Sequence, residues 1–143
     1  MKGDIFIKLR ITGQDIDSEE ITHSLVQPDF SYHKGDSYTP KYGDKLTITY
    51  NEDCFMYERQ MLEGETLDQA LAAFLSRFEG SAGYIKELSD RYNVTLWISV
   101  YPDDEQSSIH LSSDIVSRLA DMGVTVDIDM LFLKDFYSGT YSE

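Results

Sequence analysis

The residues from 94 to 133 constrain the fold most, because one segment carries the signals of a strand, a helix and a second strand. Val94 to Tyr101 alternates apolar and polar residues, which is the period of a half-buried strand. Ser112 stands where a helix N-cap belongs, and Gly123 stands where a left-handed residue would end that helix. The alternation then resumes, with an inward row expected at Val124, Val126, Ile128 and Met130. The segment predicts a strand–helix–strand unit.

The rest of the chain continues this mixture of strands and helices. Two further helices begin with a capping box or a variant of it, at Asp17 with Glu20 and at Thr66 with Gln69. The latter is the longest helix, and a second helical piece follows it to about residue 93. The other predicted segments are a first strand at residues 5–12, an aperiodic loop at 27–43, and a hairpin made of 45–50 and 54–60.

The order of these elements favours an α+β fold. We expect a two-layer sandwich in which a mixed, mostly antiparallel sheet carries helices on one face, close to a ferredoxin-like arrangement. The predicted domain covers residues 1–133, and residues 134–143 form a C-terminal tail or edge element.

Charge excludes some partners and favours others. The chain of 143 residues has 26 acidic and 12 basic side chains, a formal net charge of −14. Such a surface repels nucleic acid and anionic membranes, and it attracts a basic protein.

The N-terminal residues lack the continuous apolar core of a signal peptide, so we expect a cytoplasmic protein. The single cysteine, Cys54, forms no disulfide within the chain, and we interpret it as a small apolar strand residue.

On each predicted strand, the residues that alternate with the apolar, inward row predict a binding face. If the helices cover one side of the sheet, the other side mixes aromatic and charged groups, as contact surfaces do. The expected members of this face are Phe6, Lys8, Arg10, Thr47, Thr49, Trp97, Ser99, Tyr101, Asp127 and Asp129. An acidic turn, Asp103, Asp104 and Glu105, follows the strand and extends the predicted partner-binding surface. The alternative is a solvated face.

No catalytic or cofactor motif stands out in the chain. There is no phosphate-binding glycine loop, no nucleophile elbow and no zinc-type cysteine and histidine grouping, so we assign no catalytic residue, metal site or cofactor. Asp127 and Asp129 are the one carboxylate pair to single out, about 7 Å apart on one strand. A pair without a pocket is weak evidence for a hydrolase, and ion pairs with Lys8 and Arg10 are the simpler interpretation.

Four short motifs resemble a known family. They are Asp17-Ser18-Glu19-Glu20-Ile21-Thr22, Lys34-Gly35-Asp36, Leu111-Ser112-Ser113-Asp114, and the strand from Gly123-Val124 to Ile128-Asp129. With this spacing, the chain from about Ile5 to Met130 resembles the bacterial domain of unknown function 4279. The resemblance implies a compact α+β domain of bacteria or their phages and brings no established catalytic residues.

Three functions follow as hypotheses. The first is a small binding protein, such as an immunity protein or inhibitor, that docks a basic protein through its acidic edge and the face around Trp97 and Tyr101. Homodimer packing through that face is a variant of it. The second is a ligand-sensing domain, in which the loop at 27–43 closes over the sheet and a small molecule is held by Lys34, Arg10 or Trp97. The third is a hydrolase that uses Asp127 and Asp129.

Overall fold

Strand β1 (Asp4–Gly13) lies at the centre of a five-stranded sheet. The computed structural model describes residues 4–38, 48–101 and 108–130. Strand β1 pairs antiparallel with β5 (Asp53–Gln60) on one side and with β6 (Asn93–Tyr101) on the other. The short strand β2 (Phe30–Tyr32) pairs antiparallel with β5, and β7 (Thr125–Met130) runs parallel to β6. The sheet order is therefore β2-β5-β1-β6-β7.

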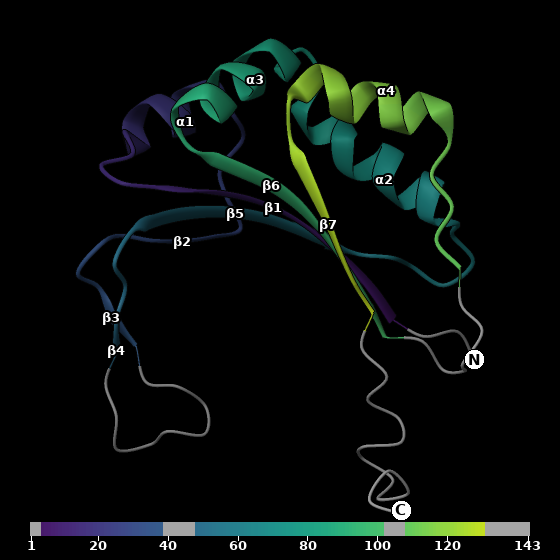
Figure 1. Cartoon of the computed structure of the whole chain (residues 1–143), viewed down its shortest axis with the longest axis horizontal. Helices are drawn as coiled ribbons and strands as arrows, with labels where there is room; N and C mark the ends of the chain where they lie inside the picture. The colour runs from purple at the N-terminus through teal and green to yellow at the C-terminus, as the bar shows by residue number, and fades with distance from the viewer. Residues whose placement is uncertain (1–3, 39–47, 102–107, 131–143) are drawn as a thin grey trace, which may run out of the picture.

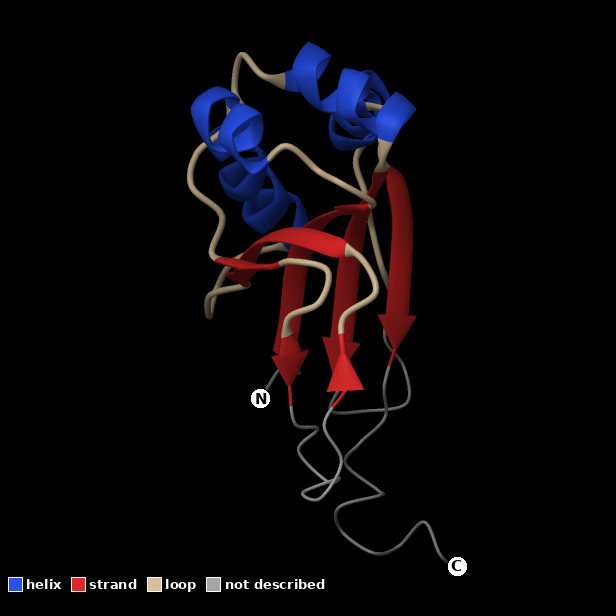
Figure 2. Ribbon diagram, turned by 90° about the vertical axis from the view of Figure 1, so that its left-hand side faces the viewer, coloured by secondary structure: helices blue, strands red, loops and turns tan. Residues whose placement is uncertain are grey.

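All the described helices lie on one side of this sheet (Figures 1 and 2). They are α1 (Ser18–Ser24), α2 (Leu67–Leu75), the single 3₁₀ turn η1 (Ser76–Phe78), α3 (Ala82–Arg91) and α4 (Ser113–Met122). Helix α1 connects β1 to β2 across β5, and α2 with α3 connects β5 to β6 across β1. These are two split βαβ units, the ferredoxin-like arrangement, to which α4 and β7 add one parallel strand. The predicted α+β fold is confirmed.

The core lies between the helices and the strand rows that point toward them. On β1 and β6, every second side chain is almost fully enclosed, from Ile7 and Ile11 to Leu96 and Ile98. Helices α2 and α3 supply the opposite wall, chiefly Leu71, Phe74, Ile85 and Leu88. The period of two in the strands and the helical spacing of the apolar residues thus meet in one layer. None of the helices in the described ranges is long and apolar enough to span a membrane.

The predicted helix ends are confirmed at atomic detail. The Asp17 carboxylate accepts a hydrogen bond from the Glu20 backbone N–H at 3.1 Å. Ser112 caps α4 by accepting from the Ile115 N–H at 3.3 Å. Gly123 ends α4 in the left-handed region, with φ 67°, so the chain turns directly into β7.

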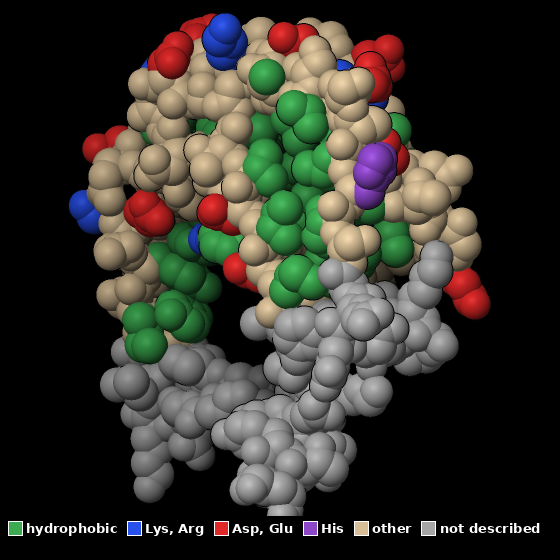
Figure 3. All heavy atoms as spheres, turned by 45° about the vertical axis from the view of Figure 1, so that its right-hand side comes forward, with side chains coloured by type: hydrophobic (Ala, Val, Ile, Leu, Met, Phe, Trp, Pro, Cys, Tyr) green, Lys and Arg blue, Asp and Glu red, His purple; other side chains and the backbone are tan. Residues whose placement is uncertain are grey.

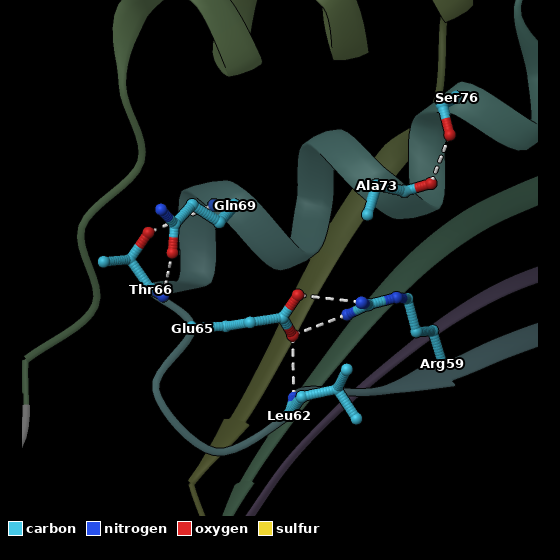
Figure 4. A network of polar contacts seen from close by, with 7 residues as sticks. All are labelled: Arg59, Leu62, Glu65, Thr66, Gln69, Ala73 and Ser76. Carbon is cyan, nitrogen blue, oxygen red and sulfur yellow. Dashed lines mark hydrogen bonds and ion pairs between the residues drawn. The ribbon is translucent and has the colours of Figure 1, made fainter.

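A polar cluster turns the chain from β5 into α2 (Figure 4). The Glu65 carboxylate accepts two hydrogen bonds of 2.8 Å from the Arg59 guanidinium and one of 2.7 Å from the Leu62 N–H. Thr66 and Gln69 then form the complete capping box that the sequence predicts. The Arg59 pair, with the Leu62 hydrogen bond, lowers the pKa of Glu65 to about 2.

Two predictions about residues 27–60 are wrong. The segments 45–50 and 54–60 do not form a hairpin, because β4 (Ile48–Thr49) pairs with β3 (Ser37–Tyr38) in a separate ribbon. The loop at 27–43 is not aperiodic over its described part, because it contains β2 and β3; residues 39–47 lie outside the described ranges. Non-local contacts set this arrangement: Asp53 binds the Ile16 N–H after β1 and the Lys34 N–H before β3, and Tyr50 exchanges backbone hydrogen bonds with Gly35 and Asp36.

Asp53 is the one charged side chain that is buried among the described residues, with 7% of its surface exposed. Its two carboxylate oxygens accept hydrogen bonds of 2.8 Å from the Ile16 N–H and the Lys34 N–H. His33 Nδ1 lies 3.7 Å from the same carboxylate. Burial acts to raise the pKa of Asp53, but these hydrogen bonds outweigh it and the pKa lies below its usual value. One carboxylate therefore joins three chain segments.

Replacing Asp53 by alanine should destabilise the fold by about 3 kcal/mol. The estimate takes about 1.5 kcal/mol for each of the two hydrogen bonds to a charged acceptor. Urea unfolding measures the change. Asp90→Ala, which removes an exposed carboxylate from α3, is the matched control and should stay within about 0.5 kcal/mol of the wild type. Equal losses in the two variants would contradict the structural role of Asp53.

Glu65 should contribute to the acid sensitivity of the fold. Its pKa in the folded protein, about 2, lies below the unfolded value of about 4.3, so its stabilising contribution is present above pH 4.3 and is lost as the pH falls toward 2. Glu65→Gln should therefore melt at a lower temperature than the wild type at pH 6, with a smaller difference at pH 2.5. Glu63→Gln, with the same charge change at an exposed site, serves as the control. A difference independent of pH would refute the coupling.

Candidate functional site

The side of the sheet turned away from the helices is the candidate site, and we call it the open face. Strand pairing places its residues in rows across the sheet, since paired residues on neighbouring strands point to the same side. No helix of the described ranges covers it (Figure 1). Its members on β1, β6 and β7 are half-buried: Phe6, Lys8, Arg10, Trp97, Ser99, Tyr101, Asp127 and Asp129. All the members predicted for these three strands share this face.

The middle of the open face is a row of four side chains. Glu58, Lys8, Trp97 and Asp127 are paired in register on β5, β1, β6 and β7. Trp97 therefore stands between Lys8 and Asp127. The ion pairs proposed from sequence, between the two aspartates and Lys8 or Arg10, do not occur among the salt bridges of the described residues. Asp127 and Asp129 lie on β7, the edge strand of the described sheet, and are half-buried.

One end of the open face is an aromatic pair. The rings of Phe6 and Tyr101 meet edge to face, with centroids 5.9 Å apart and planes at 88°. The two rings pack against each other on the open side of β1 and β6. Asp103, Asp104 and Glu105, which the sequence places beside this end, lie outside the described residues.

The other end is built from a cysteine, an arginine and stacked tyrosines. Tyr32 pairs across the sheet with Cys54, and its ring stacks on Tyr50 with centroids 3.5 Å apart. Tyr38 continues the stack on the far side of Tyr50, at 4.4 Å. Arg10 reaches the same place, and its Nε is buried without a hydrogen-bond partner among the described residues. Sequence patterns alone do not reveal this cluster, because β2 and β4 are too short to show a period.

Burial dominates the ionisation of this end of the face. It raises the pKa of the Cys54 thiol, although Arg10 and the Tyr32 hydroxyl act in the opposite direction. It also raises the pKa of Tyr32, with a further contribution from Cys54. A buried neutral thiol is a poor nucleophile, because the thiolate is the reactive form. The arrangement supports the interpretation of Cys54 as a packing residue.

Several residues named from the sequence fall elsewhere. Thr49 belongs to the β3–β4 ribbon and not to the five-stranded sheet, and Thr47 lies outside the described residues. The Lys34 N–H donates a hydrogen bond to the Asp53 carboxylate at the base of that ribbon.

The hydrolase hypothesis for Asp127 and Asp129 stays a prediction. Within the described residues, no three histidine, cysteine, aspartate or glutamate side chains gather as a metal site.

A separate hollow lies on the helical side. It is an open groove of about 430 Å³ between the end of α2 and α4, lined among others by Phe78, Arg118 and Asp121. The whole sheet lies between this groove and the open face, so it is not part of the candidate site.

The topology defines an α+β domain with a ferredoxin-like core, in which one side of the sheet has no described helix over it. A family model described as Domain of unknown function (DUF4279) matches residues 4–133. The chain belongs to this family. No curated protein matches the chain, and no solved structure does. The family description names no activity.

The cluster around Cys54 generates a prediction about reactivity. Iodoacetamide should modify Cys54 in the native protein at least about tenfold more slowly than in the unfolded chain, because the thiol is enclosed and its pKa is raised. Tyr32→Ala should accelerate the reaction, since it removes the cross-strand neighbour of Cys54. Tyr38→Ala removes an equivalent ring that pairs with Tyr50 instead, and should leave the rate within about twofold. Mass spectrometry follows the reaction, and equal rates in native and unfolded protein would contradict the packing described.

Proposed function

We propose that the protein is a protein-binding module that docks a basic protein partner through the open face. The observation that carries the proposal is the sheet side without a helix over it, on which Trp97, Tyr101 and Phe6 stand among charged side chains. Aromatic side chains supply much of the contact energy in protein interfaces, and charged neighbours supply orientation. A half-buried indole in the middle of such a face is suited to be the anchor of the contact.

The charge of the whole chain supports a basic partner. The open face itself carries both signs, with Lys8 and Arg10 on β1 against Asp127 and Asp129 on β7. The whole chain carries a formal charge of −14, which accelerates the approach of a basic molecule and repels an acidic one. In the proposed mechanism, long-range attraction brings the partner in and the aromatic residues hold it.

This role is that of an immunity protein or inhibitor, which neutralises a basic protein by covering its surface. The family resemblance supports a host among bacteria or their phages. We propose the cytoplasm as the compartment, because the single thiol Cys54 requires no oxidising surroundings.

Photocrosslinking from the open face tests the proposal. Benzoylphenylalanine in place of Tyr101 should crosslink a discrete basic protein in cells of the native host, and the yield should fall at least about tenfold when Trp97 is also replaced by alanine. Trp97→Phe, which keeps an aromatic ring, should retain most of the yield. The same crosslinker at Lys86, exposed on α3 of the helical side, is the positional control and should not capture this protein.

The salt dependence of binding distinguishes the proposed electrostatic mechanism from nonspecific association. Raising the ionic strength of a lysate from about 0.05 to 0.5 M should weaken the association, because it screens attraction between exposed charges. An association unchanged by salt and by Trp97→Ala would show that the mechanism is wrong. Equal capture from position 86 and position 101 would show that the open face is not the site.

One observation favours a ligand-sensing domain as a second candidate. The buried Nε of Arg10 has no partner among the described residues, and the Tyr32 ring and Cys54 lie beside it. A small anion, such as a carboxylate, would satisfy this donor. A thermal-shift screen of carboxylate metabolites tests the idea, since a ligand that binds the native state raises the melting temperature. The shift should be absent in Arg10→Lys; a screen without any stabilising carboxylate would dismiss this candidate.

A further inference from the structure

Strand β7 is an edge strand of the sheet that the described residues form, and its outer edge is free of any described strand. It is the last strand in the sheet order, with β6 on one side and no strand of the described residues on the other. A free edge presents unpaired backbone N–H and C=O groups and can accept a further strand. The two sides of β7 differ in chemistry, and this difference specifies what kind of strand would fit.

The helical side of β7 is apolar and incompletely covered. Ile128 pairs with Ile98 and Met130 pairs with Val100, so these side chains point to the core side as the sequence predicts. The burial expected for them is nevertheless wrong, because 42% of Ile128 and 36% of Met130 is exposed, whereas their partners on β6 are enclosed. Val116 on α4 adds a further exposed apolar side chain on the helical layer. Figure 3 shows hydrophobic side chains gathered in a band on this side of the molecule.

The open side of β7 is acidic. Asp127 and Asp129 project there, about 7 Å apart, and neither forms a salt bridge with a described residue. The edge thus offers apolar contact on one side and two carboxylates on the other. A complementary strand would alternate apolar residues with lysine or arginine, so that each row meets its counterpart.

The same pattern opposes pairing with a second copy. If two β7 strands paired antiparallel about Ile128, with the apolar row continuous, Asp127 of one copy would stand opposite Asp129 of the other. Like charges directly opposite destabilise a strand pair. Shifting the register by two residues places Asp127 opposite itself, so it does not relieve the repulsion. Charged side chains on an edge strand are also a common protection against aggregation.

We propose that the basic partner contributes an extended segment of alternating apolar and basic residues, which adds to the free edge of β7 as a sixth strand. This inference rests on the proposed function and names how the partner is held. Main-chain hydrogen bonds to β7 extend the sheet, the apolar row packs beside Ile128 and Met130, and the basic row faces Asp127 and Asp129. Trp97, on β6, lies on the open face one strand further in, with Asp127 of β7 between it and the added segment.

Synthetic peptides and the full chain provide the test. The probe is a capped, labelled heptapeptide, Thr-Lys-Val-Lys-Val-Lys-Thr, and fluorescence anisotropy measures its affinity. A peptide of the same composition without alternation, Thr-Lys-Lys-Val-Val-Lys-Thr, should bind at least about tenfold more weakly if strand pairing is required. The double variant Asp127→Asn with Asp129→Asn should also lose at least about tenfold, whereas Asp90→Asn with Asp121→Asn, two exposed helical sites, should stay within about twofold.

Hydrogen exchange supplies the direct readout. Bound peptide should slow the exchange of backbone amides in residues 125–130, while amides of α3 remain unchanged. Equal affinity of the two peptides, equal effects of the two double variants, or unchanged exchange in β7 would each overturn strand addition. If the Asp127 and Asp129 variant self-associates but the wild type binds no peptide, the aspartates only protect the edge, and the proposal is also overturned.

The two proposals fail separately. A salt-sensitive crosslink from position 101 without peptide binding would leave the docking function standing and remove strand addition. Peptide binding without any crosslinked partner would leave the edge as a strand acceptor and remove the docking function proposed for the open face.

Discussion

The structure depends on the alternation of apolar and polar side chains along β1. This strand is paired on both sides, so each of its side chains points either toward the helices or toward the open face. Ile7, Leu9 and Ile11 are fully enclosed beneath the helices, and Lys8 and Arg10 point the other way. A slip of one residue would drive both cations into the core, where uncompensated charge is very costly. A second layer of helices on the other side of the sheet would bury Lys8 and Arg10, which is unfavourable for the same reason. The open face is therefore a consequence of the sequence of the central strand.

Long-range polar contacts then fix the parts that strand pairing leaves loose. Asp53 joins the start of β5 to the β1–α1 connection and to the turn before β3. Glu65 fixes the turn from β5 into α2. Asp53 thus fixes the start of β5, and the Arg59–Glu65 pair fixes its end. Strand β5 carries Cys54 beside Tyr32 on the open face and packs Phe55 and Tyr57 in the core on the helical side. Specific polar contacts therefore hold the elements that lie behind the candidate site.

Local signals in the sequence predict much of this fold. The caps at Asp17, Thr66 and Ser112 and the left-handed Gly123 depend only on neighbouring residues, and the structure confirms them. The same holds for the rows of β1 and β6, and hence for the grouping of Trp97 with Lys8. The errors have non-local causes. The ribbon of β3 and β4 is set by contacts to Asp53 and Tyr50, and the exposure of Ile128 depends on how far the helical layer extends over the sheet. The hydrophobic periodicity of the sequence predicts neither the β3–β4 ribbon nor the exposure of Ile128.

Acrylamide quenching of tryptophan fluorescence tests the central claim most directly, because the chain contains one tryptophan and it lies in the middle of the open face. If that face is free, the quenching constant of Trp97 in the native protein at low micromolar concentration should be a substantial fraction of the constant in the unfolded chain. A native constant close to that of a fully enclosed core indole would contradict an uncovered face.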